Sequence, residues 1–165
     1  MKKKKLSARN ADINRLYEES VQCTEFEVSF INKLFKKYNN TKCESLREDF
    51  CASALISAEW VQNNEHNTAI AVDLDKNMIK EAKKTSLLRL KPDEQRRMKI
   101  CYGDSSKFTS TKVDCVLATN FSYFVFKERK KLIKYFKHVS KQLKNKGILM
   151  LDAFGGYEAH QLLEE

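Results

Sequence analysis

The stretch of residues 43–75 constrains what this chain can fold into more than any other part of the sequence. A short apolar segment, a polar loop at 48–54, a helical pattern and a second apolar segment at 69–72 follow one another, which predicts a strand, a loop, a helix and a strand. The second segment is apolar throughout, as is typical of a strand buried on both faces. Asp73 follows it, 21 positions after Ala52 in the loop. A βαβ unit that binds a nucleotide places a carboxylate roughly 20 residues beyond its loop, where it accepts hydrogen bonds from ribose hydroxyls.

The rest of the chain repeats this alternation of strand and helix patterns, which predicts a parallel sheet with helices on both faces. The expected strands are a segment that closes at Leu46 and residues 69–72, 99–102, 113–119 and 148–151. The expected helices are residues 12–21, a longer helix that Thr24 caps and residues 39–41 end, and residues 55–61, 77–90, 93–97, 127–143 and the beginning of 157–165. Lys146 and Gly147 are expected to stop the helix at 127–143.

Aromatic and aliphatic residues recur at three- and four-residue steps in the helix that begins near Thr24. This pattern predicts one buried stripe that packs in the core, and a lid over the ligand site is the functional alternative. The stripe consists of Phe26, Phe30, Ile31, Leu34, Phe35 and Tyr38.

Composition narrows the class of protein and its partners. An apolar content of 42% is ordinary for a globular chain, and no apolar run reaches the 18 or so residues of a membrane helix. The formal net charge of +9 makes nucleic acid a possible partner, but it is not favoured, because the lysines spread along the chain without clustering with aromatic residues. Five cysteines without a C-x-x-C pair predict a reducing, cytoplasmic location without disulfides, and three scattered histidines predict no metal site.

Polar residues stand at the expected carboxyl end of every strand. In an open α/β sheet, ligands bind beyond these ends, so this edge is the candidate binding site. No Ser-His-Asp or Cys-His triad, phosphate-binding G-x-x-x-x-G-K-[ST] loop or hydrolytic carboxylate pair is recognisable. The strand-end residues are Glu48, Asp73, Asp104, Asn120 and Asp152.

Several segments together resemble a known family. The stretches LYEESVQCTEFEVSFI, LREDFCASALISAEWV, AVDLDKNMI, NFSYFVFKERKKLIKYFKHV and LMLDAFGG look like those of a class I S-adenosylmethionine-dependent methyltransferase, in a bacterial-type subgroup whose first motif reads LREDFC. The resemblance implies an α/β fold, a Rossmann-like three-layer sandwich with about five mainly parallel strands. It also implies a single domain over 1–165, with an N-terminal helical segment at 1–40 and the Rossmann-like core at 41–165.

The same resemblance implies a role for each matching residue and names S-adenosyl-L-methionine as the cofactor. Asp73 would hold the ribose hydroxyls, Leu74 and Met78 would flank the adenine, and Asp104 would meet its amino group. The other implied cofactor contacts are Glu48, near the methionine amino group, Cys51, Ala52, Ser53 and Ala54 along the ligand, Gly103, and Asn120 and Phe121 near the methyl group. No catalytic base is evident, and Asn120 and Tyr123 are the candidates that border the transferred methyl.

Two features depart from the family pattern and leave other functions open. The family has glycine where this chain has Ala52, and its fold continues past the fifth strand into a closing hairpin that is expected to be absent here. A truncated or inactive methyltransferase-like scaffold is therefore one alternative, and a dinucleotide-dependent oxidoreductase is another, disfavoured by the lack of G-x-G-x-x-G. Without the hairpin, strand 148–151 would be an exposed edge and a possible homodimer contact. The methyl acceptor is not predictable.

Overall fold

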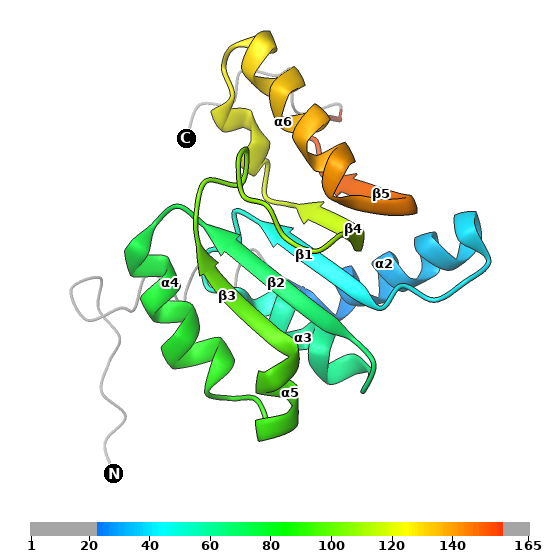
Figure 1. Ribbon diagram of the computed structural model, residues 1–165, viewed down its shortest axis with the longest axis vertical. Coiled ribbons are helices and arrows are strands. Elements are labelled where there is room, and N and C mark those ends of the chain that lie inside the picture. The colour runs from blue at the N-terminus through cyan, green and yellow to red at the C-terminus, as the bar shows by residue number, and fades with distance from the viewer. Residues whose placement is uncertain (1–22, 157–165) are drawn as a thin grey trace.

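The structure, a computed structural model, describes residues 23–156 and contains one five-stranded sheet (Figure 1). The strand order is β3-β2-β1-β4-β5, and all four neighbouring pairs run parallel. The prediction of an α/β fold with a parallel sheet is therefore confirmed. The strands are β1 (Ser45–Asp49), β2 (Thr68–Asp73), β3 (Met98–Tyr102), β4 (Val113–Ala118) and β5 (Leu143–Leu151).

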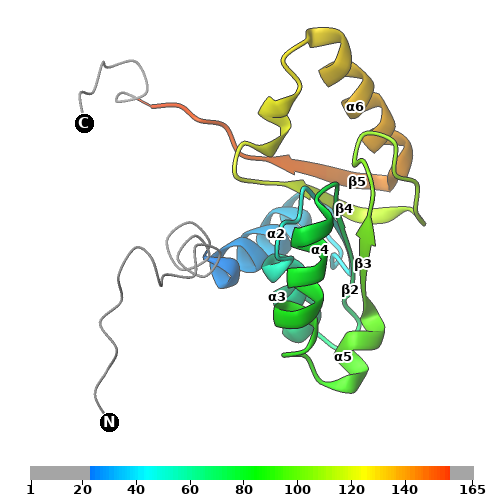
Figure 2. The ribbon, with the colours of Figure 1, turned by 90° about the vertical axis from the view of Figure 1, so that its left-hand side faces the viewer.

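Helices cover both faces of the sheet and make three layers (Figure 2). One core lies between the sheet and α2, α3 and α4, where Ile31, Ile56 and Trp60 are fully buried. The second core lies under α6, where Tyr135 and Val139 pack against Val116 of β4. The helices are α2 (Thr24–Asn39), α3 (Leu55–Asn63), α4 (Lys76–Ala82), the π-helical turn η1 (Lys83–Leu87), α5 (Pro92–Arg97), the 3-10 turn η2 (Ser122–Val125) and α6 (Arg129–Gln142).

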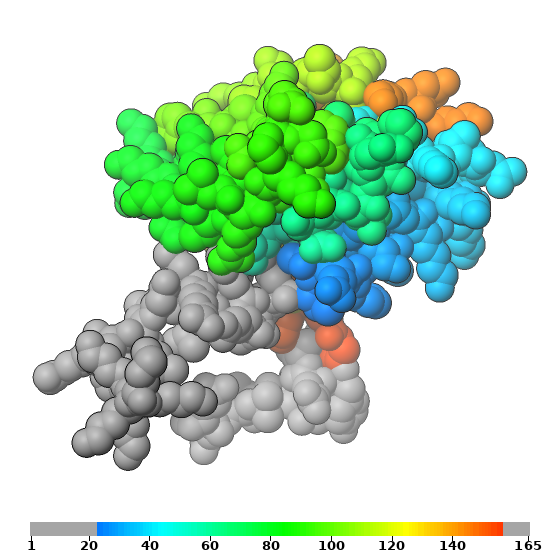
Figure 3. Space-filling view, turned by 90° about the horizontal axis from the view of Figure 1, so that it is seen from below, coloured from blue at the N-terminus to red at the C-terminus, as the bar shows by residue number. Residues whose placement is uncertain are grey.

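Helix α2 buries Ile31 and Phe35, as predicted, but not all of the predicted stripe. Its buried residues are Val28, Ile31 and Phe35, whereas Phe26 is 64% and Tyr38 is 70% exposed, so the aromatic stripe prediction is wrong at these positions. The reason is that α2 packs against α3 through the face at 28, 31 and 35, and the two helices form one continuous surface (Figure 3). Phe30, also exposed, stacks on Phe26 at 5.8 Å between ring centroids, on the flank of that face.

Three predicted boundaries are wrong. Thr24 is the first residue of α2 rather than its cap. Strand β1 includes Glu48 and Asp49, so the loop begins only at Phe50. These two carboxylates fit in a buried strand because each accepts a hydrogen bond from a buried donor. Strand β5 begins directly after α6, so Lys146 and Gly147 lie within it, where Lys146 has a φ of 62°.

The other predicted strands and helices agree with the structure to within a few residues, except that the helix expected at 77–90 changes to a π-helical turn after Ala82 and ends near Leu87. The expected helices at 12–21 and 157–165 lie outside the described residues. Strand β5 forms one edge of the described sheet, as predicted. None of the helices between residues 23 and 156 combines the length and apolar character needed to cross a membrane.

Candidate functional site

The loop after β1 has an unusual backbone for a segment that contains no glycine. Phe50, Ala52 and Ala54 all have positive φ angles, of 57°, 45° and 57°. Two backbone hydrogen bonds hold the loop: Cys51 N–H donates to the Val72 carbonyl of β2 at 3.0 Å, and Ala54 N–H donates to the Cys51 carbonyl within the loop at 2.7 Å. A left-handed conformation costs a non-glycine residue roughly 1–2 kcal/mol. Ala52 therefore carries backbone strain of about this size.

Asp73, the last residue of β2, holds this loop in place. Its Oδ2 accepts from the Ala52 N–H at 2.8 Å, and its Oδ1 accepts from the Asp75 N–H at 2.8 Å. A carboxylate has about four acceptor positions, so each oxygen keeps one for a ligand. Asp73 and Ala52, 21 residues apart in sequence, are thus in direct contact in the structure.

A cavity of about 480 Å³ opens beside Asp73, and we call it the cofactor cavity after the residues in its wall that are predicted to contact a cofactor. Its volume lies in the range of small-molecule sites, roughly 300–1,000 Å³. Three of the predicted cofactor residues, Asp73, Leu74 and Asp104, line it together. The complete lining is Phe50, Asp73, Leu74, Asp104, Ser105, Ser106, Lys107, Val125, Phe126, Lys131 and Lys134.

Asp104 follows β3 and is held as a hydrogen-bond acceptor. Ser106 donates to its Oδ1 from N–H at 2.9 Å and from Oγ at 2.6 Å, and Lys107 Nζ lies 3.3 Å from its Oδ2. Burial acts to raise the pKa of Asp104, but the Ser106 hydrogen bonds and the Lys107 charge outweigh it, so the pKa lies below its ordinary value. Its ionised oxygens can accept from a ligand amino group that enters the cavity.

Glu48 does not line the cofactor cavity. It is buried in β1, and its Oε2 accepts from Ser57 of α3, from N–H at 2.9 Å and from Oγ at 2.5 Å. Burial raises the pKa of Glu48 to about 7, although the Ser57 hydrogen bonds act in the opposite direction. Near neutral pH this carboxyl group therefore exchanges a proton inside the fold.

Most of the other predicted contacts could meet a ligand only through their backbone. The side chains of Cys51, Ser53 and Ala54 are buried in the core. Gly103 donates its N–H to the Asp73 carbonyl at 2.9 Å and thereby joins the ends of β2 and β3. Met78 is partly buried on α4 and is not among the residues lining the cavity.

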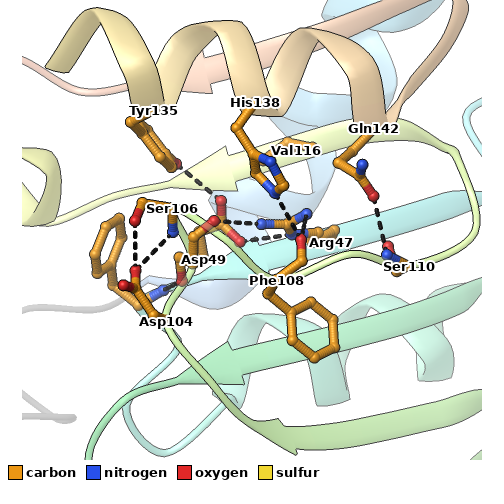
Figure 4. Close-up of polar contacts among 12 residues, drawn as sticks. Arg47, Asp49, Asp104, Ser106, Phe108, Ser110, Val116, Tyr135, His138 and Gln142 are labelled. Carbon is orange, nitrogen blue, oxygen red and sulfur yellow. Dashed lines mark hydrogen bonds and ion pairs between the residues drawn. The ribbon is translucent and has the colours of Figure 1, made fainter. Parts of the chain in front are cut away.

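A buried ion pair fastens the loop that carries Asp104, and sequence analysis missed it (Figure 4). Arg47 and Asp49 of β1 are fully buried, with Arg47 Nε 2.7 Å from Asp49 Oδ1. Arg47 also donates to the carbonyls of Ser105 at 2.8 Å and Phe108 at 3.0 Å. Tyr135 of α6 donates its hydroxyl to Asp49 Oδ2 at 2.9 Å. The network joins β1, α6 and the 103–112 loop, and so it positions one wall of the cavity.

The residues expected near the methyl group lie after β4. Asn120 and Phe121 both have positive φ, and their N–H groups donate to Asp152 Oδ2 at 2.7 Å and Oδ1 at 2.9 Å. Tyr123 is partly buried and packs edge-on against Phe124 at 4.9 Å. None of these residues lines the cofactor cavity, so the structure separates them from Asp73 and Asp104.

A second cavity of about 350 Å³ lies between α2 and the ends of β4 and β5. Glu27 and Asp152 line it together with Phe26 and Phe30, which gives the exposed aromatic residues of α2 a place beside the strand ends. Glu27 Oε2 is buried and has no hydrogen-bond partner among residues 23–156. Burial, and then the charge of Asp152, raises the pKa of Glu27. No group of three or more possible ligands for a metal ion occurs in this described part of the chain.

Solved structures with a similar fold are methyltransferases. One is an S-adenosylmethionine-dependent methyltransferase from Clostridium acetobutylicum ATCC 824, with a TM-score of 0.67, 22% identity, and coverage of 84% of this chain and 55% of that one. Another is the amino pentose methyltransferase CalS10 from Micromonospora echinaspora, with a TM-score of 0.70, 11% identity, and coverage of 94% and 59%. The sugar N-methyltransferase KedS8 from Streptoalloteichus sp ATCC 53650 has a TM-score of 0.69, 16% identity, and coverage of 93% and 60%. At these identities the likeness shows the fold, and this chain spans less than two thirds of each relative.

The family comparison is independent of these structures. No curated protein sequence matches the chain. The family model described as "Methyltransferase domain" matches residues 49–151, which include the loop after β1, the cofactor cavity and all of β5. That match covers more than half of the chain, and the fold agrees with it. The chain belongs to the methyltransferase domain family.

Proposed function

We propose that this protein binds S-adenosyl-L-methionine in the cofactor cavity and transfers its methyl group to an acceptor. The observation that carries the proposal is the joint placement of Asp73, Leu74 and Asp104 in one cavity at the ends of β2 and β3. Two of the similar structures support the choice of ligand, since CalS10 is a complex with S-adenosylmethionine and so is one structure of the glycopeptide N-methyltransferase MtfA.

The adenosine part fits the polarity of this cavity. Asp73 keeps acceptor positions that suit two ribose hydroxyls, and its carboxylate is already oriented by Ala52 and Asp75. Asp104 is held ionised and accepts from the adenine amino group. Leu74, 63% exposed at the cavity wall, gives the ring an apolar surface.

The chemistry needs alignment more than it needs acid or base groups. S-adenosylmethionine would supply the methyl group on a positively charged sulfur. A lone pair of the acceptor forms the new bond to the methyl carbon while the carbon–sulfur bond breaks, its electron pair stays on sulfur, and the acceptor's proton leaves to solvent. The protein must hold acceptor, methyl and sulfur in line and exclude water. Asn120 and Tyr123, after β4, remain the proposed residues at this reacting end.

Calorimetric titration with S-adenosylhomocysteine and with NAD tests the ligand. We expect S-adenosylhomocysteine to bind more tightly, and Asp73→Ala to weaken it by about 1–3 kcal/mol, roughly 5- to 150-fold, because a pair of charge-assisted hydrogen bonds is lost. Asp104→Ala is a second variant with the same expected direction. The matched control is Asp75→Ala, which removes a neighbouring carboxylate that caps α4 and does not line the cavity.

Two results would overturn the proposal. Tighter binding of NAD would favour a dinucleotide enzyme. Equal losses in Asp73→Ala and Asp75→Ala, with both variants folded by circular dichroism, would show that the cavity does not hold the ribose.

A further inference from the structure

The positive charge of this chain is concentrated in one segment. Residues 127–146 contain nine lysines and arginines but only one acid, Glu128, and so supply eight of the nine net positive charges. The remainder of the chain has 22 basic and 21 acidic residues and is nearly neutral. A general preference for lysine would have given every helix a net positive charge. The excess of positive charge is instead specific to α6 and the residues that flank it.

The structure arranges this charge along a groove. A depression of about 490 Å³ runs between α6 and the loop after β3, and we call it the lysine groove. No acid lines it, and no ion pair joins Lys130, Lys134, Lys137 or Lys141 to a carboxylate within residues 23–156. Its lining is Ser106, Lys107, Lys130, Ile133, Lys134, Lys137, His138 and Lys141.

The spacing of these lysines makes a row rather than a scatter. Steps of four, three and four residues keep all four side chains on one face of a helix. At about 1.5 Å per residue, the row is roughly 16 Å long, which matches several consecutive phosphates of a nucleic-acid strand. A flat membrane surface would need apolar side chains to insert, and the groove offers only Ile133.

The groove leads to the cofactor cavity and its aromatic residues. Ser106, Lys107 and Lys134 line both hollows, so they are continuous. Phe50 and Phe126 line that cavity, both are partly buried, and their ring centroids lie 6.0 Å apart. Aromatic side chains beside a basic groove are the combination on which unpaired bases stack. An acidic protein would use the charge but not the rings.

We propose that the lysine groove docks single-stranded nucleic acid, with its phosphates along α6 and a base toward Phe50 and Phe126. This binding does not require the cofactor. Only the further step, that the docked strand carries the methyl acceptor, rests on the proposed function.

Fluorescence anisotropy with labelled strands of about 12 nucleotides, one of RNA and one of DNA, tests the proposal. We expect saturable binding whose affinity falls steeply between about 50 and 200 mM salt. The test variant is Lys130→Gln/Lys137→Gln/Lys141→Gln, whose residues lie outside the cofactor cavity. It should bind at least about tenfold more weakly, with the slope of log affinity against log salt reduced by about 2, since each phosphate contact contributes about 0.7.

The matched control removes three lysines from α2, on the opposite face of the sheet, as Lys33→Gln/Lys36→Gln/Lys37→Gln, and should change the affinity less than about twofold. Either strand binding in this pattern supports the proposal, and their ratio identifies the sugar. No saturable binding, an equal loss in the control, or an equally tight interaction with duplex DNA, a polyglutamate peptide or anionic vesicles would overturn it. The groove variant should bind S-adenosylhomocysteine in calorimetry with the affinity of the wild type. This measurement distinguishes a failure of the nucleic-acid proposal from a failure of the proposed cofactor site.

Discussion

Replacing Ala52 by glycine tests how the strained loop relates to ligand binding. Ala52 has a φ of 45°, and this strain belongs to the backbone of the folded loop. Glycine would relieve roughly 1–2 kcal/mol of it, while the greater freedom of glycine in the unfolded chain costs about 0.5–1 kcal/mol. We therefore expect Ala52→Gly to be about 0.5–1 kcal/mol more stable in urea unfolding.

Ligand affinity should respond differently from stability. The hydrogen bonds from the loop to Val72 and Asp73 fix this positive φ independently of a ligand, so the strain is the same in the free and bound protein and cancels. We expect Ala52→Gly to change the affinity for S-adenosylhomocysteine less than about threefold in calorimetry, or about 0.6 kcal/mol.

Ala54→Gly is the matched control for the stability change. Ala54 has a similar φ of 57°, but its methyl group is fully buried. Loss of that methyl costs about 0.8 kcal/mol, which cancels most of the strain relief, so this variant should be close to the wild type. A gain of tenfold or more in the affinity of Ala52→Gly for S-adenosylhomocysteine would refute the reasoning, because it would show that the Cβ of Ala52 obstructs the ligand. A loss of stability in Ala52→Gly would also refute it.

Two further predictions concern buried polar groups. Tyr135→Phe should destabilise the protein by about 1 kcal/mol, because Asp49 loses a buried hydrogen-bond donor. The same change should cost little stability when Asp49 is already replaced by alanine. Additive losses of stability in a double-mutant cycle, measured by urea unfolding, would contradict this contact. The pKa of Glu48 is about 7 in the folded protein and 4.5 in the unfolded chain. Between these pH values the folded state keeps the proton and the unfolded chain releases it, so the free energy of unfolding falls as the pH rises. Glu48→Gln should therefore gain up to about 3 kcal/mol relative to the wild type between pH 5 and pH 8, and a pH-independent difference in urea midpoint would disprove it.

The parts of the site that the sequence predicts are those whose position depends on neighbouring residues along the chain. Asp73, Leu74 and Asp104 each follow a strand, and the carboxyl ends of parallel strands meet at one edge, so their shared cavity could be expected from position alone. The Arg47 network could not be expected, since Asp49 falls within the predicted loop at 48–54. Its partners Ser105 and Tyr135 lie 58 and 86 residues further along the chain, and only the tertiary fold brings them together.

The prediction of which face of α2 is buried is partly wrong for a related reason. Phe26 and Phe30 satisfy helical periodicity as well as Val28 and Ile31 do, and hydrophobicity alone does not say which face meets α3. The lysine groove is a third case, because even spacing along α6 looks like a solvated face until the loop after β3 closes its other side.

The central position of β1 in the strand order also sets the sequence in which the sheet can assemble. Ser45 pairs with Thr68, 23 residues later, whereas Leu46 pairs with Cys115, 69 residues later. Closing the longer loop costs about 1 kcal/mol more in chain entropy, and on a ribosome β4 does not yet exist when β1, β2 and β3 can pair. Until β4 arrives, one side of β1 is an open edge. Arg47 and Asp49 lie on that strand, and charges at a waiting edge discourage pairing with a strand of another nascent chain. We therefore expect the pair that later fixes the cavity wall to make the unfinished sheet less prone to aggregation as well.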